Sequence, residues 1–252
     1  MNLSFLEYST KEYKSQSQKI RVISESWFLD NGYCVECLYE LKSFPNNQPV
    51  ADFICNKCKE QYELKSKKGE FSKKIVDGEY NTMIKRINSN ENPNLFVLSY
   101  KDSLVKDIIA IPKFFFTESV IEKRKALSDH AVRAGWTGCN ILFSKIPEIG
   151  KIYVVKNGEE RPKKIVNKEW SSSKAFEIKD LKQRGWAFEI LKIIEKQKNE
   201  FCLNDVYVYK EILKEIFPEN KYIEDKIRQQ LQVLRDKNYI TFLGGGKYIK
   251  VI

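Results

Sequence analysis

Apolar residues recur at helical spacing near the start of the chain and in short runs further along it. From about residue 16 to 29, the side chains of Ile20, Ile23 and Trp27 fall on one face, which predicts an amphipathic helix. A second helix is predicted at about 80–87. Short apolar runs predict strands at 48–54, 62–66, 95–100, 108–111 and 152–155. Strands mixed with helices indicate an α/β (α+β) domain that reaches about residue 180.

The last part of the chain has a different pattern. Helices are predicted at 186–196, 204–217 and 221–237, with Asn204 as an N-cap and Pro218 ending the second helix. One face of the third helix carries an apolar stripe of Ile223, Ile227, Leu231 and Leu234. Two apolar runs around three glycines, at 239–251, then predict a β-hairpin. Three helices followed by a hairpin are typical of a winged helix-turn-helix domain.

We therefore expect two domains, 1–182 and 183–252. Residues 171–173 are three serines, and residues 182–185 are polar and end in a glycine. Both segments are candidate linkers.

The charge of the chain favours an anionic partner. Its 252 residues carry a formal net charge of +10, and 42% hydrophobic residues are enough for a core. No apolar run follows Met1 or approaches transmembrane length, so we expect a cytoplasmic protein without a membrane partner. A single histidine, His130, argues against Ser-His or Cys-His catalysis unless His130 itself takes part.

Four of the six cysteines form two Cys-x-x-Cys pairs. Cys34 and Cys37 are separated by 17 residues from Cys55 and Cys58, a spacing typical of a structural Zn²⁺ site with four thiolates. Thiols stay reduced in the cytoplasm, so a metal is favoured over disulfides. Four thiolates leave no open position on the ion, which makes the expected role structural. The other two cysteines, at 139 and 202, are expected in the core.

Two acidic residues and a lysine flank the second cysteine pair. Asp52 lies in one predicted strand, and the triplet Glu63-x-Lys65 lies in the next. Side chains alternate along a strand, so Glu63 and Lys65 share a face, and Asp52 can meet Glu63 across a metal ion. Phosphodiester hydrolysis needs Mg²⁺, carboxylates that hold it, and a group that positions water. The pattern predicts a nuclease centre, with Lys67 and Lys68 beside it to contact phosphates.

The triplet alone is a weak signal, because charged residues make up 31% of the chain. The same Glu-x-Lys spacing recurs at Glu12, Glu40 and Glu177, where a solvated surface is the simpler interpretation. At Glu63 it is preceded by a strand with Pro49-x-x-Asp52 and followed by a basic run. These neighbours favour the nuclease interpretation there.

Together, the residues resemble the PD-(D/E)xK restriction fold. The matching stretches are Pro49–Asp52, with the aspartate three residues after the proline, and 63–69, Glu-Leu-Lys-Ser-Lys-Lys-Gly. Over nearly its full length, the chain is also similar to the DpnI-like methylation-directed (Type IIM) restriction endonucleases. The stretches 133–140 and 226–237 and the arrangement of both Cys-x-x-Cys pairs carry this second resemblance.

The resemblance implies a nuclease domain with a mixed central sheet and a structural Zn²⁺, followed by a winged helix. It implies cleavage of double-stranded DNA at 5′-GATC-3′ when the adenine carries an N6-methyl group. It also implies Mg²⁺ held by Asp52, Glu63 and the carbonyl of Leu64. Both domains would recognise the methylated sequence, and we expect a monomer.

Recognition of N6-methyladenine requires particular kinds of side chain. N6-methylation adds an apolar group in the major groove and leaves one N6–H, so a reader needs an apolar contact beside a polar one. Trp136 matches the family's aromatic residue at a DNA-reading loop and could supply the apolar contact. Arg228, Gln229 and Gln232 lie off the apolar stripe of the predicted recognition helix and could supply polar contacts. Alternatively, Trp136 belongs to the core and the three polar residues form an ordinary exposed face.

Two other functions remain open. One is a non-catalytic, zinc-containing winged-helix DNA-binding regulator, which would have no reason to keep Asp52, Glu63 and Lys65 together. The other is a repair nuclease of the same fold that is indifferent to methylation.

Overall fold

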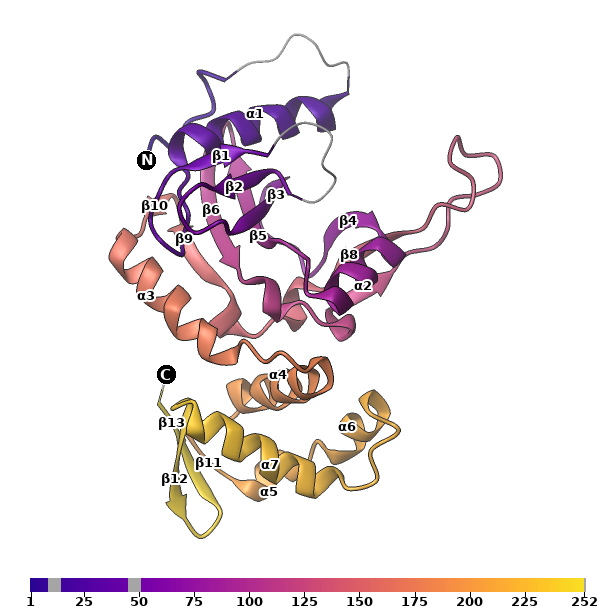
Figure 1. Cartoon of the computed structure of the whole chain (residues 1–252), viewed down its shortest axis with the longest axis vertical. Coiled ribbons are helices and arrows are strands. Elements are labelled where there is room, and N and C mark those ends of the chain that lie inside the picture. Colours follow the sequence, from indigo (N-terminus) through magenta and orange to yellow (C-terminus); the bar gives the residue numbers. More distant parts are fainter. Residues whose placement is uncertain (9–14, 45–50, 252) are drawn as a thin grey trace. The chain divides into compact units, whose positions relative to one another are not determined.

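The computed structural model describes residues 1–8, 15–44 and 51–251. Pro49, Val50 and the predicted start of their strand lie outside the described residues. The chain divides into two compact units, Met1–Lys174 and Ala175–Ile252, each described here by itself (Figure 1). The boundary expected after residue 182 falls in the first turn of helix α4 (Leu181–Lys196).

A mixed sheet forms the centre of the first unit. Within the described residues it has seven strands in the order β1-β2-β3-β5-β6-β9-β10. β3 and β5 are parallel, and the other neighbours are antiparallel. The strands are β1 (Leu41–Ser43), β2 (Phe53–Cys55), β3 (Gln61–Lys68), β5 (Asn94–Lys101), β6 (Leu104–Ile111), β9 (Ile152–Lys156) and β10 (Glu159–Glu160). The strand predictions at 62–66, 95–100, 108–111 and 152–155 are confirmed.

Helices α1 (Gln16–Asn31) and α3 (Lys163–Ser173) supply side chains to the core on one face of this sheet. Phe28 of α1 packs on Phe96 of β5 with ring centroids 4.6 Å apart, and Tyr62 of β3 stacks on Phe96 at 4.9 Å. Trp170 of α3 lies 6.3 Å from Tyr62. Because β3 turns Tyr62 and Leu64 into this core, its alternate residues face the other side.

The side chains on that other face meet a second, antiparallel sheet. It has three strands in the part of the chain that is described: β4 (Ile75–Glu79), β8 (Gly138–Ile141) and β7 (Ile121–Lys123), in that order. Helix α2 (Tyr80–Ser89) follows β4, as predicted for 80–87. The segment 124–137 between β7 and β8 projects from this sheet as a long extension (Figure 1). The chain also contains short 3₁₀ segments at Lys113–Phe115, Glu118–Val120, Phe143–Lys145, Glu148–Gly150 and Lys174–Phe176.

The second unit combines helices with a small antiparallel sheet, as expected for a winged helix. Its helices are α4, α5 (Leu203–Tyr207), α6 (Lys210–Ile216) and α7 (Ile223–Asp236). Its strands are β11 (Glu200–Cys202), β12 (Ile240–Gly244) and β13 (Lys247–Lys250), in the order β11-β13-β12. Ile227, Leu231 and Leu234 of α7 are buried, which confirms the predicted apolar stripe. The predicted hairpin is confirmed by the pairing of β12 with β13.

Several local predictions in and near this unit are wrong. The three serines at 171–173 end helix α3, where the Ser173 hydroxyl donates to the Trp170 carbonyl instead of forming a linker. Residues 182–185 begin α4, because the Asp180 side chain caps that helix by accepting from the backbone N–H of Gln183.

The helix predicted at 204–217 is interrupted by a turn at Tyr209, with φ −90° and ψ 6°, between α5 and α6. Cys202, half-buried rather than in the core, takes the N-cap position expected of Asn204. The Asp205 carboxylate accepts a hydrogen bond from the backbone N–H of Cys202 at 2.7 Å.

Among the described residues, no helix has the length and apolar content needed to cross a membrane.

Candidate active site and metal centre

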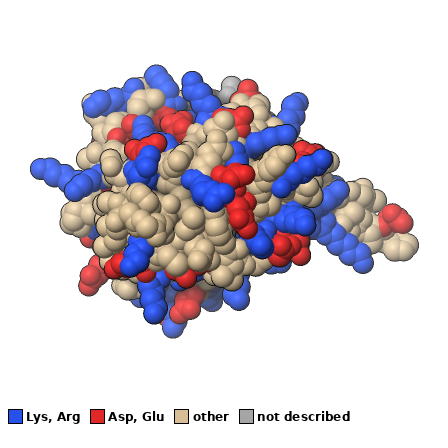
Figure 2. Space-filling model, turned by 90° about the horizontal axis from the view of Figure 1, so that it is seen from below, with Lys and Arg blue, Asp and Glu red and all other residues tan. Residues whose placement is uncertain are grey.

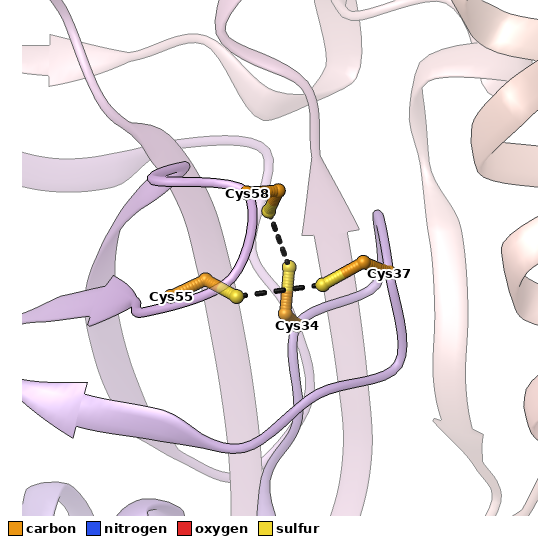
Figure 3. Close-up of side chains that lie close together, drawn as sticks. All are labelled: Cys34, Cys37, Cys55 and Cys58. Carbon is orange, nitrogen blue, oxygen red and sulfur yellow. Dashed lines mark hydrogen bonds between the residues drawn. The ribbon is translucent and has the colours of Figure 1, made fainter.

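The four cysteines of the two Cys-x-x-Cys pairs converge on one point (Figure 3). Cys34 and Cys37 follow α1, Cys55 ends β2, and Cys58 lies in the turn before β3. Their Sγ atoms all lie within 4.8 Å of one another, and Cys34–Cys58 and Cys37–Cys55 are each separated by 3.4 Å. Four thiolates about 2.3 Å from a tetrahedral Zn²⁺ are about 3.8 Å apart. The donor set and its spacing fit zinc, and the thiols are not joined as disulfides.

The surroundings of these thiols also suit a metal site. Burial raises the pKa of Cys55, but backbone N–H groups of Cys58 and Lys57 donate to its sulfur and lower the pKa to about 7. Burial raises the pKa of Cys34, whose sulfur lies 3.1 Å from the buried hydroxyl of Tyr62. A hydroxyl donor beside a metal-bound thiolate is a typical outer contact of such sites.

The pairing of β2 with β3 brings the predicted carboxylates to neighbouring positions in the sheet. The backbone N–H of Asp52 donates to the Tyr62 carbonyl at 2.9 Å. The Asp52 carboxylate in turn accepts from the backbone N–H of Leu64 at 2.8 Å. Asp52 is thereby fixed against the strand that carries Glu63 and Lys65, although only two residue pairs join β2 to β3.

Glu63 and Lys65 lie on the face of β3 opposite the core, as their alternation predicted. The Lys65 ammonium lies 2.6 Å from Oε1 of Glu63 and 2.6 Å from Oδ1 of Asp77. Burial lowers the pKa of Lys65, but the two carboxylates outweigh it and raise the pKa above its ordinary value. Burial also raises the pKa of Glu63, against the opposing charge of Lys65.

Two acids in this cluster were missed from the sequence. Asp77 lies on β4 of the second sheet, and its side chain is 4% exposed. Glu25 of α1 pairs with Arg21 at 2.6 Å, and Arg21 Nη2 lies 3.9 Å from Oδ1 of Asp52. Burial raises the pKa of Glu25. The helical spacing of Arg21 and Glu25 gave no hint of Asp52, and Asp77 lies between a run of only two apolar residues and a glycine, which is too short to predict a strand.

The oxygen ligands available here are of the kind that Mg²⁺ prefers. Asp52 and Glu63 offer carboxylates, and Leu64, whose N–H binds Asp52 and which directly follows Glu63, has a backbone carbonyl that could add a third oxygen. Within the described ranges, the cysteine cluster is the only group of three or more metal-ligating side chains with ligand atoms so close together. If Asp52 and Glu63 hold a Mg²⁺ ion, backbone oxygen and water would have to complete its coordination.

The predicted DNA contacts of the first unit lie in two places. Lys67 and Lys68 end β3, half-buried and exposed respectively. Trp136 lies near the base of the extension and is half-buried, so it is not a core residue. Its ring packs against Gly138 and lies 5.2 Å from the guanidinium of Arg133.

The predicted contacts of the second unit share the exposed face of α7. Arg228, Gln229 and Gln232 are all exposed, on the side opposite the buried stripe. Arg228 pairs with Asp225 at 2.6 Å and lies over the ring of Tyr207. Gln229 accepts from the Lys226 ammonium.

On the face that Figure 2 presents, basic side chains do not form one separate patch. Figure 2 shows Lys and Arg side chains spread among Asp and Glu over the face that it presents. The net charge of +10 therefore supports a nucleic-acid partner without marking where it binds on this face.

Comparison with known protein families covers both units. Residues 1–179 match DpnI, the Dam-replacing family, and residues 182–250 match DpnI_C, the Dam-replacing HTH domain. The first match alone spans more than half of the chain and contains the four cysteines, Asp52, Glu63 and Lys65. The chain therefore belongs to the DpnI (Dam-replacing) family, which supports a nuclease that binds DNA.

Proposed function

We propose that the protein is a methylation-directed restriction endonuclease of the PD-(D/E)xK fold. It cleaves double-stranded DNA at 5′-GATC-3′ when the adenine is N6-methylated, by Mg²⁺-dependent hydrolysis of the phosphodiester bond, and it acts as a monomer. The observation that carries the proposal is that Asp52 is bound to β3 beside Glu63 and Lys65, which share one face of that strand, within the part of the chain that matches the family.

Asp52, Glu63 and the Leu64 carbonyl would hold Mg²⁺. The bound ion would polarise the scissile phosphate and lower the pKa of a coordinated water. Asp52 is kept in place by the Leu64 N–H, so the carboxylate needs little rearrangement to accept the ion. A structural Zn²⁺ at the four cysteines would hold the turn that follows β2, the strand that Asp52 immediately precedes.

Lys65 has a separate task. Its raised pKa keeps the ammonium protonated at neutral pH, so it acts as a fixed positive charge and hydrogen-bond donor rather than as a base. From the same face as Glu63, it can orient the attacking water and stabilise the negative charge that develops on the phosphate. Lys67, two residues along the same face, and Lys68 would contact neighbouring phosphates.

Recognition of the methylated site would involve both units. The half-buried Trp136 offers an apolar ring to the N6-methyl group. On the exposed face of α7, Arg228, Gln229 and Gln232 offer donors and acceptors to base edges. A regulator without catalysis would need these residues but not the cluster around Lys65. A repair nuclease would need the cluster but not the methyl contact.

One digestion separates these three functions. Plasmid from an adenine-methylating host and plasmid from a non-methylating host are each incubated with the protein and Mg²⁺. Cutting of methylated plasmid alone, with ends that map to GATC, is expected. Absence of cutting in both would exclude a nuclease, and equal cutting of both would exclude methylation dependence.

Lys65→Ala tests the catalytic assignment. Cleavage should be abolished while binding to a methylated duplex is retained, because Lys65 acts on the reacting phosphate rather than on sequence recognition. Lys74→Ala removes an exposed lysine that pairs with Glu122 in the second sheet, and should leave cleavage unchanged. If Lys65→Ala loses binding together with cleavage, Lys65 contributes to structure or affinity instead.

A further inference from the structure

We propose that Asp77 is a positioning residue for Lys65 in the cleavage reaction. Asp77 would hold the Lys65 ammonium at the reacting phosphate when Glu63 binds the metal ion. This inference rests on the proposed nuclease function and assigns a role to a side chain from a second sheet.

Asp77 is buried, and its main charged partner is the Lys65 ammonium. Its Oδ1 lies 2.6 Å from the Lys65 ammonium and also accepts from the backbone N–H of Gly78 at 2.7 Å. Its Oδ2 is buried and has no hydrogen-bond partner among the described residues. Burying a carboxylate with one oxygen unsatisfied is costly, and the cost is offset here mainly by the charge of Lys65. The contact with Lys65 is therefore the interaction that best accounts for a charged side chain at this buried position.

Charge explains why Glu63 and Asp77 would have different roles, with Glu63 binding the metal ion and Asp77 holding Lys65. Both carboxylates contact Lys65, but Glu63 is also a proposed ligand of Mg²⁺. An oxygen that coordinates a cation holds an ammonium less firmly, because the two positive charges repel each other. Asp77 is not among the proposed ligands of Mg²⁺, so its contact with Lys65 would not be weakened in this way.

The backbone fixes the position of Asp77. It lies in β4, directly opposite Cys139 of β8 in the antiparallel register. Cys139 is fully buried, so this part of the second sheet is anchored in the interior. A carboxylate on a paired strand holds its partner in a better-defined position than one on a surface loop. Small misplacements of reacting groups lower the reaction rate strongly.

Asp77→Asn tests the proposal with little change in shape. Single-turnover cleavage of a methylated GATC duplex with Mg²⁺ should slow roughly ten- to hundredfold. Binding of the same duplex, measured with Ca²⁺ in place of Mg²⁺, should be unchanged. Glu122→Gln is the matched control, because Glu122 is an acid of the same sheet that pairs with Lys74 and does not contact Lys65. It should cleave at the wild-type rate.

A second measurement reports on Lys65 without cleavage. Amine acetylation followed by mass spectrometry gives the reactivity of Lys65 relative to the exposed Lys68. With saturating Mg²⁺, Lys65 should be protected in the wild type and become reactive in Asp77→Asn. In the wild type this readout does not depend on whether any variant folds.

The outcomes are distinct. If the wild type does not cleave methylated DNA, the proposed function fails whatever Asp77 does. If the wild type cleaves and Asp77→Asn cleaves equally fast, the positioning role is wrong. It is also wrong if Lys65 of the wild type reacts as fast as Lys68, or if rate, duplex binding and thermal stability fall together in Asp77→Asn.

Discussion

The hydroxyl of Tyr62 connects the cysteine site to the strand that carries Glu63 and Lys65, and its removal gives a quantitative test of bound zinc. Tyr62 is fully buried on β3, next to Glu63, and its hydroxyl lies 3.1 Å from Cys34 Sγ. Burial raises the pKa of Tyr62, so the hydroxyl keeps its proton and can donate. Tyr62→Phe removes only this donor, since the ring that stacks on Phe96 is retained.

The size of the effect depends on the charge of the sulfur. A hydrogen bond to a charged group contributes about 1.5–3 kcal/mol, and one between neutral groups contributes about 0.5–1.5 kcal/mol. Cys34 is a thiolate when Zn²⁺ is bound. Without the ion it is a thiol at neutral pH, because burial raises its pKa. The difference, about 1–1.5 kcal/mol, corresponds to a roughly five- to tenfold weaker zinc affinity in Tyr62→Phe. No water replaces the lost donor at a fully buried site, which favours the upper value.

Zinc transfer to a chromogenic chelator, at fixed pH, measures this affinity. Tyr33→Phe is the matched control. Tyr33 precedes Cys34 and is also buried, but its hydroxyl has no hydrogen-bond partner within the described part of the chain. Its removal should leave the zinc affinity unchanged.

Two results would refute this reasoning. An unchanged zinc affinity in Tyr62→Phe would mean that the hydroxyl does not distinguish thiolate from thiol. An equal loss in Tyr33→Phe would mean that general repacking, rather than a hydrogen bond to sulfur, controls the affinity.

Three further predictions concern the metals and the methyl group. Cys55→Ser should lose bound zinc and duplex cleavage together, while Cys202→Ser, outside the cluster, should keep its zinc by elemental analysis. Trp136→Ala should lower the preference for methylated over unmethylated duplex about fourfold or more in a competition assay, since one buried CH₂ contributes about 0.8 kcal/mol. Burial raises the pKa of Glu63, so protons compete with Mg²⁺ at a higher pH than at an ordinary glutamate, with pKa about 4.3. At fixed Mg²⁺, the cleavage rate should therefore begin to fall at a pH above the ordinary pKa of glutamate, and added Mg²⁺ should restore part of the lost rate.

Periodicity and spacing were sufficient for the parts of the fold that have strong local patterns. The helical spacing of Ile20, Ile23 and Trp27 predicted α1, and the alternation along 62–66 placed Glu63 and Lys65 on one face of β3. The spacing of the cysteine pairs predicted their convergence, because each Cys-x-x-Cys turn already directs two sulfurs to one point.

Contacts set by tertiary structure could not be read in the same way. Asp77 lies in a strand of five residues with only two buried side chains, and its role depends on pairing with β8, which begins about sixty residues later. Arg21 and Glu25 have the i,i+4 spacing of a helical ion pair, yet nothing in that spacing indicates that the fold brings Asp52 to Arg21. For the same reason serines at 171–173 resembled a linker, although the burial of Trp170 and Ser173 makes them helical.

The four-cysteine site and the proposed catalytic carboxylates depend on the same short hairpin. β2 is three residues long and is joined to β3 by two residue pairs, so its backbone ladder alone is a weak clamp. Asp52 comes immediately before β2, and Cys55 ends it. On the other strand Tyr62 contacts Cys34 through its hydroxyl and is followed by Glu63. A metal at the cysteines would therefore fix both strands at one end, and the Asp52–Leu64 hydrogen bond would fix them at the other. The geometry of the proposed Mg²⁺ site at Asp52 and Glu63 would then depend on zinc, although zinc would take no part in the chemistry.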